Sequence, residues 1–495
     1  MALSREDITI TAAQAYGAPP TSGYANDPVN TGTGNFLETE VDLGFPGGAG
    51  SLRWERTYNS LDERAGAFGP GWSSVAQVRL RVEDDGATLV LPDGREVVFP
   101  RQGEGWDRAV GESRWLTRES GPEGDKLVVS GNDGSRWLFT VGGQWLSASS
   151  GPGTRVDVEY DGGRLVAAAG PGGTRRYGWN ADGLLESVTD AGGVVEVRNR
   201  YDAKRRVLAQ TSPFGRTTRY AYLPGRATVV SDADGSRSNT WISDARGRLV
   251  GILDPAGRRQ SMSYDAAGNL LSATGRDGTV TAHAYDARGR LVRTKTPSGA
   301  DITRGYDEFD RVMTLIAEQG GVTSYEYATD VDRSPSVVID PEGGRTQLTW
   351  DDGLLVEVTD PEGVSVRLGY DPFGDLISTT DADGNTARLL RDQAGRVVAA
   401  VSPSGARTEY RYTPAGLLAS RRDPLGATWR YTYEAGGRLG AIVDPLGART
   451  VMEHGEHGAV SRTIDPLGRA IAREFDDLGN VSAALLPDGT SWRFA

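Results

Sequence analysis

The stretch Tyr264-Asp265-Ala266-Ala267-Gly268-Asn269-Leu270 returns as Tyr285-Asp286-Ala287-Arg288-Gly289-Arg290-Leu291 and again as Tyr306-Asp307-Glu308-Phe309-Asp310-Arg311-Val312. The three copies start about 21 residues apart, and a fixed period of this length is the signature of a repeat architecture. About sixteen copies cover the last two-thirds of the chain. The degenerate copies fall at Tyr160, Trp179, Tyr201, Tyr222, Trp241, Tyr327, Trp350, Tyr370, Tyr412, Tyr433 and Phe475, with weaker ones at Leu390 and His454.

A second phrase, Asp-Pro-x-Gly or a relative, lies half a period away. Proline fixes φ at a turn, and aspartate and glycine favour turn geometry, so each unit contains two turns. Two turns leave two extended runs of about six or seven residues, which predicts one β-hairpin per unit. The phrase begins at Asp254, Asp340, Asp360, Asp423, Asp444 and Asp465, and in serine or threonine versions at Ser212, Thr296 and Ser402.

The runs between the turns alternate with a period of two. In Thr428-Trp429-Arg430-Tyr431-Thr432-Tyr433 the aromatic residues share one face and the polar residues the other, which is the strand pattern. A twisted sheet of about thirty such strands cannot stay flat. The sequence therefore predicts an all-β fold, in which continuous antiparallel β-hairpin repeats form a spiralling sheet. The frame of leucine-rich repeats is absent and propeller blades are longer, but a parallel β-helix remains an alternative.

The composition excludes several classes of protein. The 495 residues include 67 glycines and no cysteine, so disulfide frameworks and thiolate chemistry are absent. The net charge of -13, with both signs interspersed, argues against a nucleic-acid partner. No apolar run is long enough to predict a membrane span, and Met1 to Ile10 lacks the pattern of a Sec signal.

The phrase Tyr-Asp-x-x-Gly-Arg-Leu at this spacing resembles the YD repeats of Rhs proteins, Tc-toxin C components and teneurins, over about residues 150 to 495. Upstream, the stretches at 26–35, 56–60 and 68–72 resemble the region that precedes the repeats in bacterial Rhs proteins. The resemblance implies a hollow cocoon, whole or partial, that encloses a carboxy-terminal toxin for delivery to another cell. We expect an interior of polar groups and scattered aromatic residues.

The expected organisation has three parts: an extended leader at 1–25, an amino-terminal β-rich capping region at 26–150, and a YD-repeat shell at 151–495. The sequence stops inside a repeat, at Phe494-Ala495, and no toxin domain is recognisable in it. We therefore expect a shell truncated at its carboxy terminus.

The main functional hypothesis is a non-enzymatic encapsulation module of an Rhs-type polymorphic toxin. Its expected partner is a toxin or other passenger polypeptide, and a component of the secretion machinery is kept as a further partner. Delivery would follow a route other than Sec, from the cytoplasm to the outside. The alternative is a cell-surface adhesion or carbohydrate-binding protein.

No catalytic, cofactor-binding or metal-binding residue is predicted. Asp423, Asp444 and Asp465 begin Asp-Pro-Leu-Gly, but they recur one period apart and lack the trailing leucine of the family's self-cleavage motif, so they are expected to be turns. Glu453-His454-Gly455-Glu456-His457 could bind zinc or nickel, but His454 occupies a tyrosine position and a solvated turn is favoured. His283, the third histidine, has no predicted partner for nucleophilic hydrolysis.

Three further patterns have structural explanations. Asp232-Ala233-Asp234-Gly235 and the stretch 381–385 resemble calcium loops only faintly and fit turns. The other carboxylates mostly occupy turn positions, which leaves no pair for a glycosidase site. Aromatic packing explains the tryptophans before the repeats, although a sugar site would be sought there first. These tryptophans are Trp106, Trp115, Trp137 and Trp145.

Overall fold

A computed structural model describes most of the chain. Most of the expected leader lies outside the described residues, as does part of the stretch 26–35. The described residues are 16–19, 21–25, 29–44, 53–66, 69–74, 78–91, 93–109, 114–121, 124–131, 136–148, 157–162, 164–170, 173–330, 332, 334–351, 353–371, 375–392, 396–434 and 436–494.

One antiparallel sheet of 33 strands dominates the structure, from β16 (Asp157–Asp161) to β48 (Ser491–Arg493). Every strand pairs with its neighbours in the sequence, so the predicted hairpin repeats are confirmed and the parallel β-helix is excluded for this part of the chain. No helix occurs among the described residues, so they contain no helix that is long and apolar enough to cross a membrane. The boundaries of the three predicted parts remain predictions.

The strands of this main sheet have the following bounds: β16 (Asp157–Asp161), β17 (Arg164–Gly170), β18 (Gly173–Trp179), β19 (Leu185–Thr189), β20 (Val195–Tyr201), β21 (Val207–Thr211), β22 (Thr217–Leu223), β23 (Ala227–Asp232), β24 (Ser238–Ser243), β25 (Leu249–Leu253), β26 (Arg259–Tyr264), β27 (Leu270–Thr274), β28 (Val280–Tyr285), β29 (Leu291–Lys295), β30 (Asp301–Tyr306), β31 (Val312–Ile316), β32 (Val322–Glu326), β33 (Val337–Ile339), β34 (Arg345–Asp351), β35 (Leu354–Thr359), β36 (Ser365–Tyr370), β37 (Leu376–Thr380), β38 (Thr386–Arg391), β39 (Val397–Val401), β40 (Arg407–Tyr412), β41 (Leu418–Arg422), β42 (Thr428–Tyr433), β43 (Leu439–Val443), β44 (Arg449–His454), β45 (Val460–Ile464), β46 (Ala470–Phe475), β47 (Val481–Leu485) and β48 (Ser491–Arg493).

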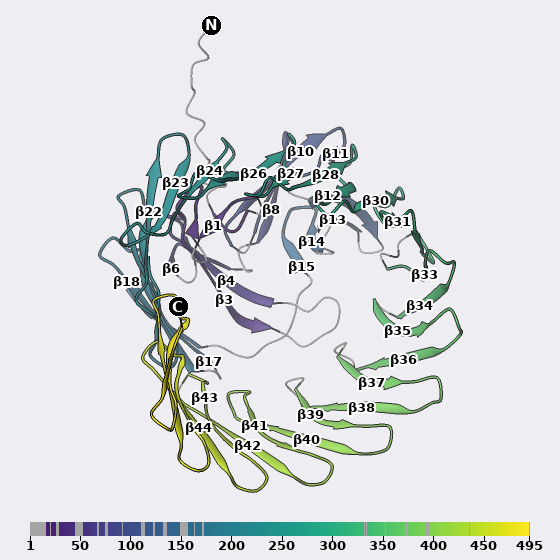
Figure 1. Cartoon of the computed structure of the whole chain (residues 1–495). Helices are drawn as coiled ribbons and strands as arrows, with labels where there is room; N and C mark the ends of the chain where they lie inside the picture. The colour runs from purple at the N-terminus through teal and green to yellow at the C-terminus, as the bar shows by residue number, and fades with distance from the viewer. Residues whose placement is uncertain are drawn as a thin grey trace.

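The hairpins differ systematically at their two ends. We call the turns that follow the even-numbered strands of the main sheet tyrosine-side turns, and those that follow the odd-numbered strands proline-side turns. Register shifts recur beside the tyrosine-side turns, as at Ser263/Tyr264, Ala284/Tyr285 and Gly305/Tyr306, whereas the proline-side pairs between them have none. A β-bulge bends its strand and increases the twist, so bulges at one end of successive hairpins favour a coiled sheet. Figure 1 shows the sheet as a ring that passes its own beginning.

Where the sheet passes its own beginning, we call its first hairpins the first pass and its last hairpins the second pass. Side chains from turns join the two passes. Arg438, on a tyrosine-side turn of the second pass, forms an ion pair with Asp190, 248 residues earlier on a proline-side turn. Phe214, also on a proline-side turn, stacks on His457 with ring centroids 4.6 Å apart and lies 5.7 Å from the ring of Phe475. Each contact joins a proline-side turn of the first pass to the tyrosine-side end of a hairpin in the second.

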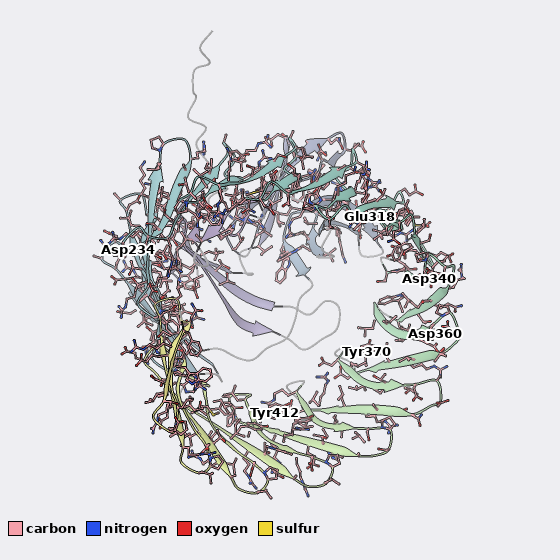
Figure 2. The ribbon with its side chains drawn as sticks, viewed as in Figure 1. Asp234, Glu318, Asp340, Asp360, Tyr370 and Tyr412 are labelled. Atoms are coloured by element: carbon pink, nitrogen blue, oxygen red, sulfur yellow. The ribbon has the colours of Figure 1, made fainter. Side chains whose placement is uncertain are left out.

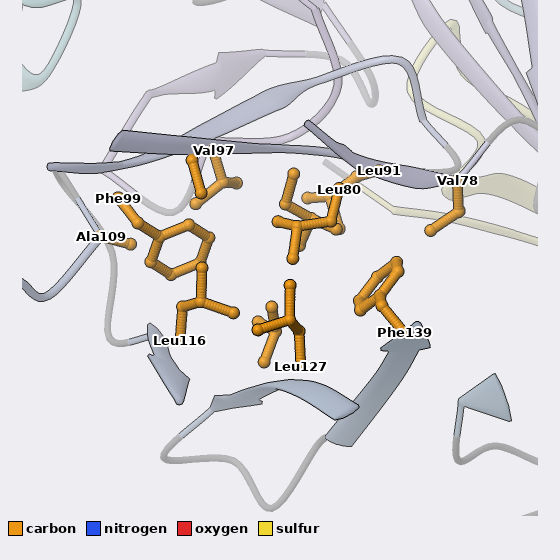
Figure 3. Close-up of a cluster of buried hydrophobic side chains, with 12 residues drawn as sticks. Val78, Leu80, Leu91, Val97, Phe99, Ala109, Leu116, Leu127 and Phe139 are labelled. Carbon is orange, nitrogen blue, oxygen red and sulfur yellow. The ribbon is translucent and has the colours of Figure 1, made fainter. Parts of the chain in front are cut away.

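The amino-terminal region forms small sheets that lie inside the ring (Figure 1). Two four-stranded sheets, β8 to β11 and β12 to β15, enclose one apolar core, in which Phe99 and Phe139 are fully buried (Figure 3). The strands are β1 (Tyr24–Ala25), β2 (Val29–Asn30), β3 (Leu37–Gly44), β4 (Arg53–Asn59), β5 (Ala65–Gly66), β6 (Gly69–Pro70), β7 (Trp72–Ser74), β8 (Arg79–Glu83), β9 (Gly86–Val90), β10 (Glu96–Gln102), β11 (Gly105–Trp106), β12 (Arg114–Gly121), β13 (Gly124–Gly131), β14 (Arg136–Thr140) and β15 (Trp145–Ala148).

A second core joins the amino-terminal strands to the main sheet. Phe36, Tyr58 and Trp72 pack with Tyr177 and Val188 of the main sheet, and Tyr58 and Trp72 are at most 1% exposed. We call the face of the main sheet that holds these residues the inner face. Polar contacts reinforce the packing, since the Tyr58 hydroxyl accepts a hydrogen bond of 3.0 Å from the backbone N–H of Leu185.

The contact between passes predicts a selective loss of stability. Phe214→Ala removes two aromatic contacts and should destabilise the second pass by about 1 to 2 kcal/mol. Hydrogen exchange of β44 and β46 would measure this change. Leu446→Ala is the control, because Leu446 occupies the same turn position as Phe214 but is 93% exposed, and it should leave exchange unchanged. Equal effects of the two substitutions would contradict the contact.

Candidate functional site

The two kinds of turn share one hydrogen-bonding pattern. On the tyrosine side, the Asp286 Oδ1 accepts bonds from the backbone N–H groups of Arg288, at 2.9 Å, and Arg290, at 3.0 Å. On the proline side, the Asp254 Oδ1 accepts them from Ala256, at 3.0 Å, and Arg258, at 2.9 Å. The fourth residue of each turn is a glycine with φ of 78°, which a residue with a Cβ adopts only with strain. The same aspartate cap therefore occurs at both kinds of turn.

The turn carboxylates are held in their charged form. Partial burial opposes ionisation of Asp286, but the backbone and side-chain hydrogen bonds from Arg290 outweigh it and lower the pKa of Asp286 below its usual value. The Arg290 Nε donates to the Asp286 Oδ2 at 2.6 Å. A low pKa and a full set of donors make such a carboxylate a structural cap and a poor general acid or base.

The tyrosine before the turn links neighbouring hairpins. The Tyr306 hydroxyl donates a hydrogen bond of 2.8 Å to the carbonyl oxygen of Leu291, and the Tyr412 hydroxyl one of 2.7 Å to that of Val397. The acceptor lies 15 residues earlier in both cases. The Trp350 Nε1 makes the equivalent bond to Pro335 at 2.8 Å. The repeated tyrosine thus satisfies a backbone carbonyl in the preceding hairpin.

Two of the predicted tyrosine positions are wrong. Arg391, not Leu390, occupies the position before the turn, and its Nε donates to the Leu376 carbonyl at 3.3 Å, also 15 residues away. Ser243, not Trp241, precedes the turn at Asp244 and pairs with Leu249. In both repeats the prediction chose the nearby aromatic or apolar residue. The position is instead set by the turn aspartate, which directly follows it.

The inner face continues along the whole main sheet because alternate residues of a strand point to the same side. Tyr370 and Tyr412 lie at the inner ends of their hairpins and Asp340 and Asp360 at the outer ends (Figure 2). From β34 onward the inner face is mainly apolar and aromatic, so the expectation of a polar interior is wrong for this part of the sheet. Its large residues include Leu348, Trp350, Leu368, Tyr370, Leu389, Tyr410, Tyr412, Trp429, Tyr431, Tyr433, Met452 and Phe475.

The aspartates weighed as cleavage residues lie in ordinary proline-side turns. The Asp423 Oδ1 accepts from the backbone N–H groups of Leu425 and Ala427, at 3.0 and 2.8 Å, and Asp444 and Asp465 repeat the pattern. Two stretches weighed as calcium loops also form turns, because the backbone N–H of Gly235 bonds to the Asp232 carbonyl and that of Gly384 to the Asp381 carbonyl. The turn at Asp381 is of the same kind, whereas that at Asp232 is one residue longer.

The three histidines have different contacts. His457 is in the stack with Phe214, and the His454 Nδ1 lies 3.1 Å from the Glu434 Oε2. His283 lies 3.3 Å from the Thr294 hydroxyl, and partial burial lowers its pKa. The described part of the chain contains no group of three or more histidine, aspartate or glutamate side chains placed to hold a metal ion.

The tryptophans before the repeats pack in the amino-terminal region. Trp106, Trp137 and Trp145 are partly buried against the core of the two four-stranded sheets, and the Arg108 guanidinium lies 5.9 Å from the ring centroid of Trp115. Packing explains their clustering. The stack of Phe214, His457 and Phe475 was missed because the residues are far apart in the sequence, and only the coil radius brings them together.

Comparisons with known proteins agree with this architecture. A model of the RHS repeat matches residues 244–280, 264–301, 285–322, 350–386, 391–427 and 412–450. A domain of unknown function, DUF6531, matches residues 26–99. Both matches fall where the sequence shows the repeats and the region that precedes them.

Curated relatives share a short segment. The tRNA nuclease WapA of Bacillus subtilis strain 168 is 35% identical over 77 residues, which are 16% of this chain and 3% of WapA. The tRNA3(Ser)-specific nuclease WapA of Bacillus spizizenii matches to the same extent. The chain thus spans only a small part of the relatives that it matches.

Solved structures of Tc-toxin components are similar over a longer range. The crystal structure of TcdB2-TccC3-TEV matches with 14% identity and a TM-score of 0.42, over 87% of this chain and 24% of that one. The Photorhabdus luminescens Tc holotoxin pore matches with 14% identity and a TM-score of 0.40, over 88% and 24% of the two chains.

The fold and its turns define a YD-repeat sheet protein. With the RHS repeat matches, the chain belongs to the Rhs family of YD-repeat proteins.

The tyrosine bond predicts a measurable loss of stability. Tyr412→Phe leaves the Val397 carbonyl without this donor and should lower the free energy of unfolding by about 0.5 to 1.5 kcal/mol. Chemical denaturation would measure the change. Tyr410→Phe is the control, because the Tyr410 hydroxyl makes no hydrogen bond within the described part of the chain. The role of the tyrosine is refuted if both variants behave alike.

The low pKa values of the turn aspartates predict acid instability. A carboxyl whose pKa is depressed in the folded state stabilises the fold above its unfolded pKa, about 3.9, and this contribution is lost as the pH falls through the folded value. Melting temperatures should therefore fall steeply below about pH 4. Thermal melts from pH 7 to pH 2 would show this, and a melting temperature independent of pH would contradict it. Asp286, Asp307 and Asp476 have such lowered pKa values.

Proposed function

We propose that this chain forms a shell that encloses a passenger polypeptide, as a structural module of an Rhs-type toxin delivered to another cell. The observation that carries the proposal is the inner face of the main sheet. Tyrosine and tryptophan positions recur on this face in both halves of the ring, but within the described residues only the first half is covered by the amino-terminal strands.

The covered half shows how this face holds polypeptide. Tyr220 is 3% exposed, and its hydroxyl donates to the Ala25 carbonyl at 3.1 Å. The Thr228 hydroxyl donates to the Thr31 carbonyl at 2.6 Å. Apolar packing thus combines with side-chain bonds to the backbone of the covering segment, and these hydrogen bonds do not depend on that segment's side chains.

The later half of the ring has equivalent inner-face positions, but within the described residues the amino-terminal strands do not cover them. The core that joins the two regions extends along the main sheet to Trp241, and the equivalent residues from β34 onward are only half-buried or exposed, as for Trp350 at 36%. Half of the residues that line a shallow groove on this part are apolar and hydroxyl residues of the inner face. These are Leu376, Thr379, Ala387, Leu389, Ala400 and Thr408. An apolar surface of this extent usually marks an interaction site.

The amino-terminal region also contacts the tyrosine-side turns. The Arg205 Nε donates to the Ser60 carbonyl at 2.8 Å, and the Ser22 hydroxyl donates to that of Gly247 at 3.3 Å. These contacts support a cap over one end of the coil, which would otherwise leave the turns and the first strands exposed.

The polypeptide-binding face can be tested with an unstructured probe. A dansyl-labelled peptide of about 20 residues, rich in leucine and tyrosine and without charge, should bind the chain, because association would bury apolar surface. Fluorescence titration measures the affinity. Leu368→Asn and Leu389→Asn together should weaken binding at least about tenfold.

Leu390→Asn is the matched control, since Leu390 follows Leu389 but lies on the outer face and is 41% exposed. It should leave binding unchanged. No binding of the peptide, or equal losses in the two variants, would refute the enclosing role of the inner face. Binding of glycans in its place would favour a carbohydrate-binding function.

A further inference from the structure

We propose that the uncovered inner face selects for a passenger rich in aspartate and glutamate. This inference rests on the proposed function and specifies its partner. The observation behind it is the one-sided distribution of carboxylates in β34 to β47: arginines lie on both faces, whereas every strand carboxylate in this range lies on the outer face or at a turn.

The inner arginines lie among aromatic and apolar residues. Arg421 pairs with Tyr410 on one side and with Trp429 on the other, and its guanidinium lies 5.4 Å from the ring centroid of Trp429. Arg473, opposite Ala484, donates to the Thr463 hydroxyl at 2.9 Å. Within the described part of the chain, these two arginines contact a ring and a hydroxyl and form no ion pair with a carboxylate.

The carboxylates of the same strands point outward. Glu357 pairs with Thr349, on the face opposite Leu348, and its Oε1 lies 3.0 Å from the Arg367 Nε. Glu409 and Glu453 lie between inner-face residues of their own strands and so belong to the outer face. They form ion pairs with Arg407, at 3.0 Å, and Arg462, at 3.2 Å.

The turn carboxylates offset the inner charge only in part, since among the inner-face arginines the Arg391 Nη1 lies 3.9 Å from the Asp375 Oδ1. The Asp465 Oδ1 accepts from backbone N–H groups, and its Oδ2 accepts from the Arg469 Nε at 2.6 Å, so its charge is compensated within the turn. The inner face around Arg421 and Arg473 is therefore electropositive, although the net charge of the chain is -13. An acidic partner would satisfy guanidinium groups that an apolar surface desolvates, whereas a basic partner would be repelled.

Two variants of the uncharged peptide test the proposal, one with four glutamates and one with four lysines at the same positions. The glutamate peptide should bind at least about tenfold more tightly than the lysine peptide at low ionic strength. The difference should shrink as salt is added, because screening weakens interactions between partly exposed charges. Fluorescence titration of the full chain measures each affinity.

Arg421→Gln with Arg473→Gln should remove most of this preference, since glutamine keeps a polar side chain without the charge. Arg430→Gln with Arg449→Gln is the control, because these exposed arginines lie on the outer face of β42 and β44. Circular dichroism and a melting curve verify that each variant is folded.

The possible results separate the two proposals. Equal affinities for the glutamate and lysine peptides, or tighter binding of the lysine peptide, would overturn the charge selection while binding of the uncharged peptide upholds the enclosing function. An unchanged preference in the Arg421 and Arg473 variant would also overturn it. Failure of all three peptides to bind would refute the enclosing function itself.

Discussion

The aspartate-capped turn is the interaction on which the rest of this structure depends. One carboxylate accepts two backbone N–H groups, as Asp286 and Asp254 do, and a glycine supplies the positive φ that closes the loop. Because turns of this kind, with threonine or serine in place of aspartate in some repeats, occur at both ends of the hairpins, antiparallel pairing continues without interruption from β16 to β48. The acidic composition of the chain follows largely from this use of aspartate.

The uninterrupted pairing has two consequences for function. It keeps one set of alternate residues on the inner face throughout, so the surface that packs on Tyr58 and Trp72 recurs in later hairpins. It also places the bulges at one end of the hairpins, which bends the sheet into a coil. A wall with an apolar inner face and a polar outer face results, and its carboxylates are used in turns and ion pairs.

The architecture of the wall was predictable because its determinants are local. The turn phrases, the period and the alternation of residues act within about 21 residues, and they specify strands, pairing and the two faces. The predicted tyrosine position was wrong where an apolar or aromatic residue was preferred over the residue that directly precedes the turn, as with Leu390 in place of Arg391. The polarity of the inner face was also misjudged, because the aromatic and aliphatic residues of neighbouring strands combine only when the face is assembled.

By itself, the sequence determined the hairpin repeat, the antiparallel sheet and the absence of cysteine chemistry, because each depends on residue type and short spacing. Only the tertiary structure decided that Phe214 meets His457 and that Arg438 meets Asp190, since these contacts depend on the radius of a coil that sums small bends over many strands. It also decided which half of the inner face the amino-terminal strands cover, because that cover is a packing contact between segments far apart in the chain.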